Sequence, residues 1–447
     1  MRFRQENTAL VADIESMFHQ VKVREEDQHS LRFLWWDTST TNPLEEYVVT
    51  VHIIGATDSS CAENASLKRT ADDNVEDFDP VTIETLKCNF YGDDLSKSVP
   101  TSSPAIRLAD QLVKLCRRGG FNLTKFISNE RHVLAEIPFL VLDLDKLPIY
   151  RALGVRWKIE PDTLGFNVAD LDKPSTMRGV LSTISSGFAP LNFAALVMLP
   201  AKQIMQTLRR RRLPWDQPIC GDILEKWKKW KSCLPLLENV SIPRCYFSRL
   251  GHEGVRLQLH HFCDASEIGY GTATYLHIEY PDAMTECSFL TGRSRNAPIK
   301  STSIPRLELQ GALLAARIDL IIIIIIICIY SAQIQHRFSH ARYKYKLKIR
   351  LKNSLKNNIN ITSGLAVRRK IDFQFDKVIF WSDSMITLNY MKNESRRFQI
   401  YLANRVKEIR EMTHPDQWRH CPGRINPAND VSRGLEMDEF LKNNQRN

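Results

Sequence analysis

The segment 372–394, DFQFDKVIFWSDSMITLNYMKNE, contains the pattern from which the fold of this chain can be worked out. The apolar, β-favouring run 378–381 leads into the acid Asp383, and a helix-like pattern begins at once. An acid at the carboxyl end of a buried strand lies where α/β sheets build their functional sites. Ser382 or Asp383 could equally be an ordinary helix N-cap. Further acids at the ends of other predicted strands would favour the interpretation that Asp383 belongs to a functional site.

Composition sets broad limits on the protein. With 447 residues, the chain can form two or three domains and bury a substantial core. The hydrophobic fraction of 43% and the charged fraction of 25% are typical of a soluble globular protein. The ten cysteines form no CxxC pair and no Cys/His cluster with zinc spacing, which favours a reducing compartment. The N-terminus has no apolar signal-peptide core, so we expect a protein that is not secreted.

The net charge of +10 comes from one segment. Residues 321–370 contain eleven Lys or Arg and no Asp or Glu, so the rest of the chain has a net charge of −1 (10 − 11). The same segment opens with seven isoleucines, but the apolar run 320–330 is too short for a bilayer, which needs roughly 20 residues. We interpret residues 320–370 as a low-complexity insertion, such as translated non-coding sequence. The alternative is a basic arm that contacts nucleic acid.

Two acidic patterns precede this segment near the N-terminus. A strand-like run ends in Asp13, which could also be a helix cap. Residues 88–99 predict a β-hairpin with its turn at Gly92–Asp94, and Gly and Asp are ordinary turn residues. Two adjacent carboxylates together with a third from another strand can also bind two Mg²⁺ ions for phosphoryl transfer. We also expect strands at 31–36 and 47–54 and a helix at 62–74.

At these residues the chain resembles a known family. ADIESMFHQVKV together with FYGDD is similar to the reverse transcriptase palm of the BEL/Pao group of long-terminal-repeat retrotransposons. The resemblance implies that Asp13, Asp93 and Asp94 are metal ligands, flanked by Tyr91 and Gly92 at the substrate. It also implies that Phe18 excludes a ribose 2′-hydroxyl, although core packing is the simpler role for that residue.

The palm departs from the family pattern. Gly92 stands where the family has Val or Met, and only about a dozen residues precede Asp13, so the fingers are almost absent. We expect a truncated palm without polymerase activity. Residues 171–250 match the connecting region of the family. Three tryptophans there could line a nucleic-acid groove or simply pack in the core: Trp215, Trp227 and Trp230.

The opening pattern recurs further along the chain. A strand ends at Asp264 and is followed by a Gly-rich return strand, which resembles the first acidic strand of ribonuclease H. The motif IPRLELQ (304–310) predicts a helix with Pro305 in its first turn and resembles the glutamate helix of the same enzyme in this group. Its Glu308 could instead be an acid that stabilises the positive end of a helix. Asp383 follows these two acids in the family order.

The fourth acidic position is altered. Relatives carry Asn-Pro-Ala-Asp before Ser-Arg-Gly, whereas this chain has Asn429 after Ala428 and an acid only at Asp430. A shift of one residue rotates a helical side chain by about 100°, so Asp430 substitutes only if the helix start adjusts. Asn429 would supply a neutral oxygen instead. His420 resembles a mobile histidine of some ribonucleases H, although a structural role is the simpler explanation.

Together these features predict a retrotransposon Pol fragment from a longer polyprotein. The expected fold is an α+β polymerase palm without fingers (1–170), a thumb and connection (171–250) and an α/β ribonuclease H-like domain with a mixed sheet (251–440). By resemblance, the metal ligands of that domain are Asp264, Glu308, Asp383 and Asn429 or Asp430, and they hold Mg²⁺, with Mn²⁺ as an alternative. The implied partners are an RNA–DNA hybrid, or an RNA template with a DNA primer and deoxynucleotides, and no membrane. The implied location is a cytoplasmic element particle or the nucleus.

Three functions remain open at this point. The first is hydrolysis of RNA in RNA–DNA hybrids by the ribonuclease H-like domain, beside a vestigial palm. The second is a degenerate, non-catalytic element relic that at most binds nucleic acid. The third is active reverse transcription.

Overall fold

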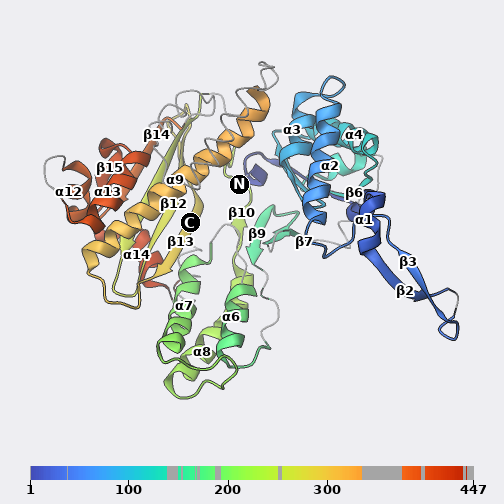
Figure 1. Cartoon of the computed structure of the whole chain (residues 1–447). Helices are drawn as coiled ribbons and strands as arrows, with labels where there is room; N and C mark the ends of the chain where they lie inside the picture. The colour runs from blue at the N-terminus through green and yellow to red at the C-terminus, as the bar shows by residue number, and fades with distance from the viewer. Residues whose placement is uncertain are drawn as a thin grey trace.

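The computed structural model describes residues 2–37, 39–137, 149–152, 155–166, 168, 172–186, 193–249, 254–334, 375–393, 398–435 and 439. The side chains of residues 2, 151, 152, 155, 186 and 324–334 are not described. Figure 1 shows three parts along the chain: an N-terminal α/β part, a central helical bundle and a C-terminal sheet crossed by one long helix.

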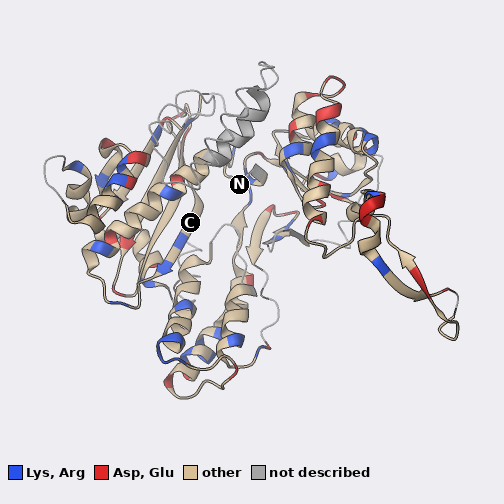
Figure 2. Ribbon diagram, in the orientation of Figure 1, with Lys and Arg blue, Asp and Glu red and all other residues tan. Residues whose placement is uncertain are grey.

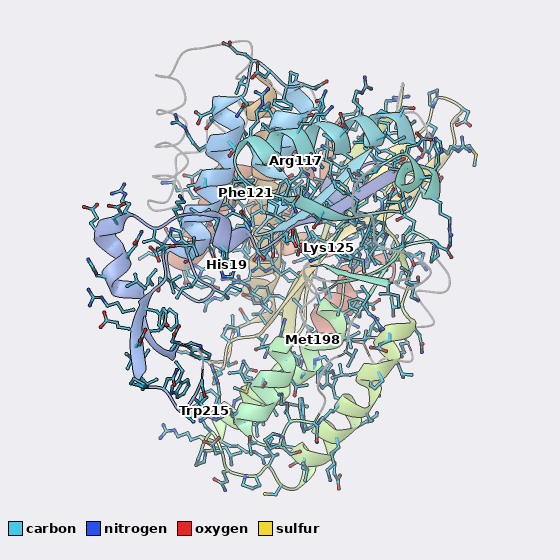
Figure 3. All side chains as sticks on the ribbon, turned by 90° about the vertical axis from the view of Figure 1, so that its right-hand side faces the viewer. His19, Arg117, Phe121, Lys125, Met198 and Trp215 are labelled. Atoms are coloured by element: carbon cyan, nitrogen blue, oxygen red, sulfur yellow. The ribbon has the colours of Figure 1, made fainter. Side chains whose placement is uncertain are left out.

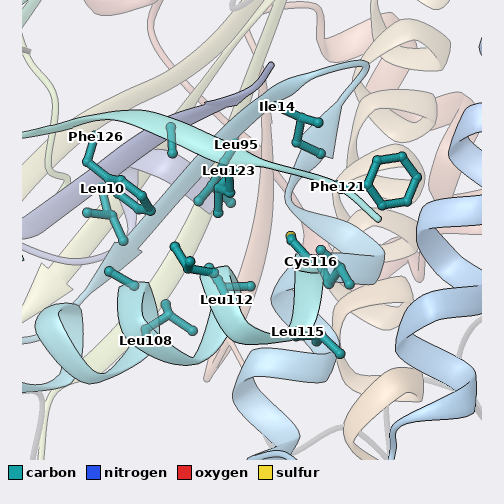
Figure 4. Close-up of a cluster of buried hydrophobic side chains, with 14 of the residues drawn as sticks. Leu10, Ile14, Leu95, Leu108, Leu112, Leu115, Cys116, Phe121, Leu123 and Phe126 are labelled. Atoms are coloured by element: carbon teal, nitrogen blue, oxygen red, sulfur yellow. The ribbon is translucent and has the colours of Figure 1, made fainter. Parts of the chain in front are cut away.

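The N-terminal part is built on an antiparallel sheet of order β4-β5-β1-β6. Its strands are β1 (Thr8–Ile14), β4 (Phe90–Tyr91), β5 (Asp94–Val99) and β6 (Leu123–Ser128). The helices beside it are α2 (Ser59–Asp73), α3 (Pro80–Cys88), α4 (Ser102–Arg118) and the short α5 (Arg131–Glu136). The side chains of Leu10 and Ile14 from β1 meet Leu112 and Cys116 from α4 in one buried cluster (Figure 4). Because β1 is buried almost throughout, its acid Asp13 is held on a rigid strand.

The other face of β1 packs on a second small sheet. Ala9 and Val11 lie in one buried cluster with Trp157 and Leu164. That sheet has the order β10-β9-β8-β7. Its strands are β7 (Ile149–Ala152), β8 (Val155–Lys158), β9 (Thr163–Phe166) and β10 (Ile242–Pro243). Since β10 comes from far along the chain, this sheet ties the N-terminal part to the region that follows the helical bundle.

A hairpin projects from the N-terminal part (Figure 1). It consists of β2 (Arg32–Trp36) and β3 (Leu44–Val48) and follows the short helix α1 (Glu25–Gln28). The strand expected at 31–36 is confirmed. The strand expected at 47–54 was misplaced, because β3 ends at Val48 and the chain beyond it forms only an isolated bridge at Val51. The helix expected at 62–74 is confirmed by α2.

The central bundle contains α6 (Met177–Ser186), α7 (Ala195–Arg210) and α8 (Asp222–Cys233). Its core includes Met177, Leu208 and the fully buried Trp227. Basic residues follow one another where α7 ends, at 209–212, and Figure 2 shows Lys and Arg gathered at this end of the bundle.

The C-terminal part is a five-stranded mixed sheet of order β13-β12-β11-β14-β15. The strands are β11 (Arg256–Ala265), β12 (Gly269–Glu279), β13 (Thr285–Asn296), β14 (Lys377–Ser382) and β15 (Trp418–His420). The first three pair antiparallel, whereas β14 and β15 run parallel to β11. The helices are α9 (Ile304–Ile334), α12 (Met385–Lys392), α13 (Ile400–Met412) and α14 (Ala428–Arg433). The mixed α/β sheet expected from the sequence is therefore present.

The isoleucine run begins inside helix α9. The helix continues to Ile334, and Ile322 is buried in the same core cluster as Leu314 and Ile318. The insertion boundary expected at about 320 therefore falls within a helix that is packed at least as far as Ile322. Residues 335–370 of the expected insertion lie outside the described residues. Within the described part of the chain, no helix is long and apolar enough to cross a membrane.

Two buried arginines join the parts of the molecule. Arg244 forms an ion pair with Asp162 and donates hydrogen bonds to main-chain carbonyls of residues 3, 6 and 7. Arg4 donates to the carbonyl oxygens of Arg244, Pro243 and Phe289. Since Phe289 belongs to β13, these two side chains connect the N-terminal segment to the β9–β10 region and to the C-terminal sheet.

Candidate metal centre

Three acids meet at one edge of the C-terminal sheet. Asp264 lies near the end of β11, Glu308 lies in the first turns of α9, and Asp383 follows β14. Each offers one carboxylate oxygen, and these three oxygens lie within 4.8 Å of one another. Within the described part of the chain, this is the one group of three or more His, Cys, Asp or Glu residues that converges so closely.

Local packing explains the convergence. β11 and β14 are parallel neighbours with Cys263 opposite Ser382, so the acids that follow these residues emerge at the same edge. Helix α9 approaches that edge closely because residue 311 is glycine. A Cβ atom there would lie 3.0 Å from the main-chain oxygen of Asp264. Glu308, one turn before Gly311, therefore faces the two aspartates.

Because these carboxylates are buried, their ionised forms are unfavourable. Asp264 is 2% exposed and Glu308 is 7% exposed. Burial, with the neighbouring Asp264 and Asp383 carboxylates adding to it, raises the pKa of Glu308 to about 8. Burial also raises the pKa of Asp264 to about 6, although a hydrogen bond from Ser432 partly offsets the rise.

The donor set fits a divalent cation. Oε2 of Glu308 and Oδ1 of Asp383 are buried and have no hydrogen-bond partner among the described residues. A buried carboxylate oxygen without a partner is normally stabilised by a proton, a donor or a metal ion. Because carboxylate oxygens are the preferred ligands of Mg²⁺, the three acids could hold such an ion.

Asp383 is not the helix cap. The N-cap of α12 is Ser384, whose hydroxyl accepts a hydrogen bond from the main-chain N–H of Thr387 at 3.3 Å. The capping role considered for Ser382 and Asp383 is therefore wrong, since the cap lies one residue further on. The carboxylate of Asp383 is left to face the other acids.

The start of α14 decides which residue takes the fourth position. Asn429 donates a hydrogen bond from Nδ2 to the carbonyl of Gly423, and its buried Oδ1 has no partner among the residues that the structure describes. A Cβ atom at Gly423 would lie 3.0 Å from Oδ2 of Asp383, so this carbonyl region adjoins the acids. Asn429 thus lies on the side of the metal centre.

Asp430 lies in a different environment. Burial and the Glu439 carboxylate raise its pKa, and Arg433 opposes the rise. Asp430 in turn adds to the raised pKa of Tyr275, a residue of β12. The neighbours that set the pKa values of Asp264 and Glu308 do not include Asp430. The structure therefore brings Asn429, rather than Asp430, to the edge of the metal centre.

Ser432 and His420 complete the surroundings. The hydroxyl of Ser432 donates a hydrogen bond to Oδ2 of Asp264, and its carbonyl accepts one from Ser266. Sequence reasoning missed this role, although Ser432 belongs to the Ser-Arg-Gly motif that supported the resemblance. His420 is exposed on β15, opposite Ser382 of β14, and so lies at the rim of the same edge.

The N-terminal acids are arranged differently. The hairpin expected around Gly92 is confirmed, with Tyr91 opposite Asp94 and Gly92 at a φ of 63°. Asp13 lies directly opposite Asp94 in the β1–β5 pair, and Asp93 lies exposed in the turn. The oxygens of these three acids do not converge as closely as those of the C-terminal group.

Two side chains from other strands bind the acids of the N-terminal sheet. Lys125 forms an ion pair with Asp13 at 2.9 Å between Nζ and Oδ1, which raises the pKa of Lys125. A β-bulge in the β1–β6 pair brings Lys125 to Asp13, and Lys125 has a φ of 54°. Figure 3 labels Lys125. The hydroxyl of Tyr150 donates to Oδ1 of Asp94 at 2.8 Å. Burial raises the pKa of Asp94, and this hydrogen bond opposes the rise.

The remaining residues expected at the palm site lie close by. Phe18 is half-buried in the short 3-10 helix Met17–Gln20. Tyr91 and Gly92 are exposed in the hairpin. Sequence reasoning missed Glu63 of α2, which is 1% exposed and whose buried Oε1 has no partner in the described part of the chain. Burial, together with the carboxylate of Asp93, raises the pKa of Glu63 to about 7.

The three tryptophans of the connecting region differ in exposure. Trp227 is fully buried and stacks on Trp230 with 5.2 Å between ring centroids. Trp230 donates a hydrogen bond from Nε1 to the carbonyl of Val197. Trp215, labelled in Figure 3, lies between α7 and α8 and remains 41% exposed. Core packing therefore accounts for Trp227 and Trp230.

Comparisons with known proteins agree with this architecture. Residues 176–333 match the family described as Pao retrotransposon-like RNaseH-like domain. Among solved structures, the chain is similar to the foamy viral protease-reverse transcriptase dRH in complex with double-stranded DNA. That likeness has 12% sequence identity and a TM-score of 0.50, and it covers 95% of this chain and 58% of that chain. No curated protein matches the sequence.

These findings define the class of fold. The fold is similar to that of a reverse transcriptase, with a ribonuclease H-like domain. The family match over residues 176–333 covers about a third of the chain and agrees with the resemblance to the Pao group in the sequence motifs. The structural likeness shows the fold alone, and the chain spans 58% of the length of that solved chain.

Proposed function

We propose that the ribonuclease H-like domain hydrolyses the RNA strand of RNA–DNA hybrids in a reaction that depends on a divalent metal. The observation that carries this proposal is the convergence of Asp264, Glu308 and Asp383 at one buried edge of the sheet. Mg²⁺, or Mn²⁺ in its place, would supply Lewis-acid activation of water and stabilisation of the leaving oxygen.

The residues of the chain have separate tasks in this proposal. Asp264 and Glu308 carry raised pKa values in the absence of metal, so they release their protons as the ion binds. Ser432 keeps one oxygen of Asp264 in a fixed direction. Asn429 offers a neutral oxygen, which leaves the centre with one negative charge fewer than four acids would give.

The substrate class follows from the family and the fold. A hybrid duplex would be recognised through its A-like shape and its 2′-hydroxyls rather than its base edges. The solved reverse transcriptase with a similar fold is in complex with double-stranded DNA, which supports a nucleic-acid partner for this chain. We place the protein in cytoplasmic element particles or in the nucleus, where such hybrids arise.

The test is cleavage of a hybrid with a labelled RNA strand. Wild-type protein should release RNA fragments with Mg²⁺ and none with EDTA, and Asp383→Asn should abolish release. Asp416→Asn is the matched control, because Asp416 is an acid of the same domain whose side chain is 90% exposed. Failure of the wild type to exceed Asp383→Asn would refute hydrolysis at this centre.

A second candidate is a non-catalytic relic that binds nucleic acid. Asn429 favours it, since a neutral residue at the fourth position weakens the charge available to bind metal. Hybrid binding that is unchanged by Mg²⁺ and by Asp383→Asn, without cleavage, would support this candidate over the first.

Reverse transcription ranks third among the candidates. The polymerase acids would be Asp13, Asp93 and Asp94, but Asp13 is paired with Lys125 and Asp94 with Tyr150. Metal binding there requires at least the first of these contacts to break. Primer extension on an RNA template, lost in Asp94→Asn, would reverse this ranking.

A further inference from the structure

The hairpin of β2 and β3 carries a row of exposed apolar side chains. On β2, Leu34 is 60% exposed and Trp35 is 58% exposed, and Phe33 beside them is exposed as well. Within the described sheets the two strands pair with each other alone, and the hairpin projects from the N-terminal part (Figure 1). A lone two-stranded hairpin is marginally stable in water, so these exposed apolar groups favour association with another surface.

Both faces of the hairpin contribute apolar surface. The register places Phe33 opposite Tyr47 and Leu34 opposite Glu46, so Phe33 and Trp35 lie on one face and Leu34 lies on the other. The rings of Phe33 and Tyr47 stack with 5.7 Å between their centroids. A partner that covered only one face would leave apolar side chains of the other face in water, whereas a strand added at an edge extends both faces.

The charge of the hairpin argues against nucleic acid as its partner. Residues 32–48 contain one basic residue, Arg32, and three acids, Asp37, Glu45 and Glu46, which gives a net charge of −2 (1 − 3). Figure 2 shows acidic residues on the hairpin and on the short helix before it. Arg32 is already paired with Glu46 at 2.6 Å. Because a polyanion would meet a negative surface there, the hairpin is suited to a protein partner.

The two edges of the hairpin differ in how well they resist pairing with another strand. Charged residues and proline are common protections of an edge strand. Strand β3 contains Glu45 and Glu46 and follows Pro43, so its edge is protected. Strand β2 contains neither an acid nor a proline, and its one charged residue, Arg32, is bound to β3. The edge of β2 is therefore the one that can accept a further strand.

We propose that β2 pairs antiparallel with β2 of a second copy of this chain, which forms a four-stranded sheet across a two-fold axis. Full overlap of residues 32–36 places Leu34 opposite Leu34 of the partner subunit and Phe33 opposite Trp35 of the partner subunit. Apolar and aromatic cross-strand pairs of this kind stabilise antiparallel sheets. The acids Glu45 and Glu46 stay on the two outer strands, where they do not face each other.

The expected dimer is weak. An aromatic side chain buries about 150–250 Å² in full, so each half-exposed side chain of β2 offers on the order of 100 Å². Two copies would bury roughly 600–1,000 Å², which is below the standard interface of about 1,600 Å². We therefore expect a dissociation constant in the micromolar range and a dimer that depends on protein concentration.

Sedimentation equilibrium of the full chain over a range of concentrations tests the proposal. The wild type should approach the mass of two chains as its concentration rises. Leu34→Lys should weaken this association at least tenfold, because two ammonium groups would face each other on the axis. Within its own hairpin the new lysine lies opposite Glu46, so the hairpin is retained. Leu44→Lys is the matched control, because Leu44 is 51% exposed on the same hairpin but lies on β3.

A cross-linking variant gives a positive signal for the same contact. In Leu34→Cys the two thiols lie across the axis, so mild oxidation should link two chains faster than in Leu44→Cys. The wild type, with exposed thiols such as that of Cys220, sets the background. A wild type that stays monomeric, a dimer that Leu34→Lys does not weaken, or equal weakening by Leu44→Lys would overturn the proposal. Loss of RNA–DNA hybrid binding in Leu34→Lys at unchanged mass would also overturn it, in favour of a nucleic-acid contact.

Discussion

The hydroxyl of Ser432 on α14 donates a hydrogen bond to Oδ2 of Asp264 on β11, 168 residues earlier in the chain. The bond lowers the pKa of Asp264 and so opposes the rise caused by burial. It also fixes one carboxylate oxygen and leaves the other to face Glu308 and Asp383. Ser432 is therefore a positioning residue of the proposed metal centre.

Replacing Ser432 by alanine should weaken metal binding. Without the hydroxyl, the pKa of Asp264 rises further, so Mg²⁺ competes with a more tightly held proton. A buried charged acceptor left without its donor also costs about 1–3 kcal/mol of stability. We expect the Mg²⁺ concentration for half-maximal cleavage to increase several-fold, most clearly below pH 7. An equal effect at pH 6 and pH 9 would argue for a purely structural role of the hydroxyl.

Parts of this centre could be predicted from the sequence because they are local patterns. The run before Asp383 alternates little and favours β structure, and Pro305 marks the start of the helix that carries Glu308. Asp264 lies near the end of its strand, Glu308 in the first turns of its helix and Asp383 directly after its strand, so correct elements were enough to place each acid. The hairpin at Gly92 was predictable for the same reason, since its turn chemistry lies within a few residues.

Other features depend on contacts between distant segments. Lys125 reaches Asp13 only because a β-bulge shifts the register of β6, and single-sequence patterns do not show such a bulge. The choice between Asn429 and Asp430 depends on where α14 begins, and sequence patterns are least accurate at helix ends. Helix α9 continues into the isoleucine run, where Ile322 is buried in the tertiary structure. The composition of this segment alone does not show that burial.

Asn429→Asp should strengthen metal binding, whereas Asp430→Asn should change it little. Oδ1 of Asn429 is buried beside the acids and finds no partner in the described ranges, so a carboxylate there adds a negative ligand. Asp430 lies near Tyr275 and Glu439 instead. We expect Mg²⁺ to bind about tenfold more tightly to Asn429→Asp, measured by calorimetric titration.

Asn429→Asp should also change the thermal stability of the metal-free protein. A fourth carboxylate near Asp383 adds repulsion, so Asn429→Asp should melt at a lower temperature than wild type in EDTA and recover with Mg²⁺. If Asp430→Asn instead produced the larger change in Mg²⁺ affinity, the assignment of the fourth position would have to be reversed.

Glu308→Gln should alter how stability depends on pH. The pKa of Glu308 rises from 4.5 to about 8 in the folded, metal-free protein. Its folded-state pKa exceeds its unfolded value, so its contribution is fully present below pH 4.5 and is lost as the pH rises through 8. Glutamine cannot ionise, so the variant avoids that loss.

We therefore expect Glu308→Gln to melt close to wild type at pH 5 and above it at pH 9, both in EDTA. The difference should be on the order of 4–5 kcal/mol, because the pKa rises from 4.5 to about 8 and each pKa unit corresponds to about 1.4 kcal/mol. Thermal denaturation across this range provides the measurement. A constant difference at all pH values would show that ionisation of Glu308 is not its cause.

Arg244→Met should destabilise the whole molecule. The side chain of Arg244 is fully buried, pairs with Asp162 and donates to the carbonyls of Phe3, Glu6 and Asn7. Its loss leaves Asp162 half-buried without this cation and removes one donor from each of the three carbonyls, of which that of Asn7 keeps the amide of Asn129. Breaking a buried ion pair on one side typically costs about 3–5 kcal/mol.

Urea denaturation of Arg244→Met provides the measurement, and Arg178→Ala provides the control. Arg178 also pairs with an aspartate, Asp216, but both side chains are largely exposed, so its loss should leave the unfolding midpoint close to that of the wild type. Since the side chain of Arg244 ties residues 3–7 to Asp162, Arg244→Met should in addition increase proteolysis between the N-terminal segment and the β9–β10 region. Equal midpoints for the two variants would mean that Arg244 does not join the parts of the fold.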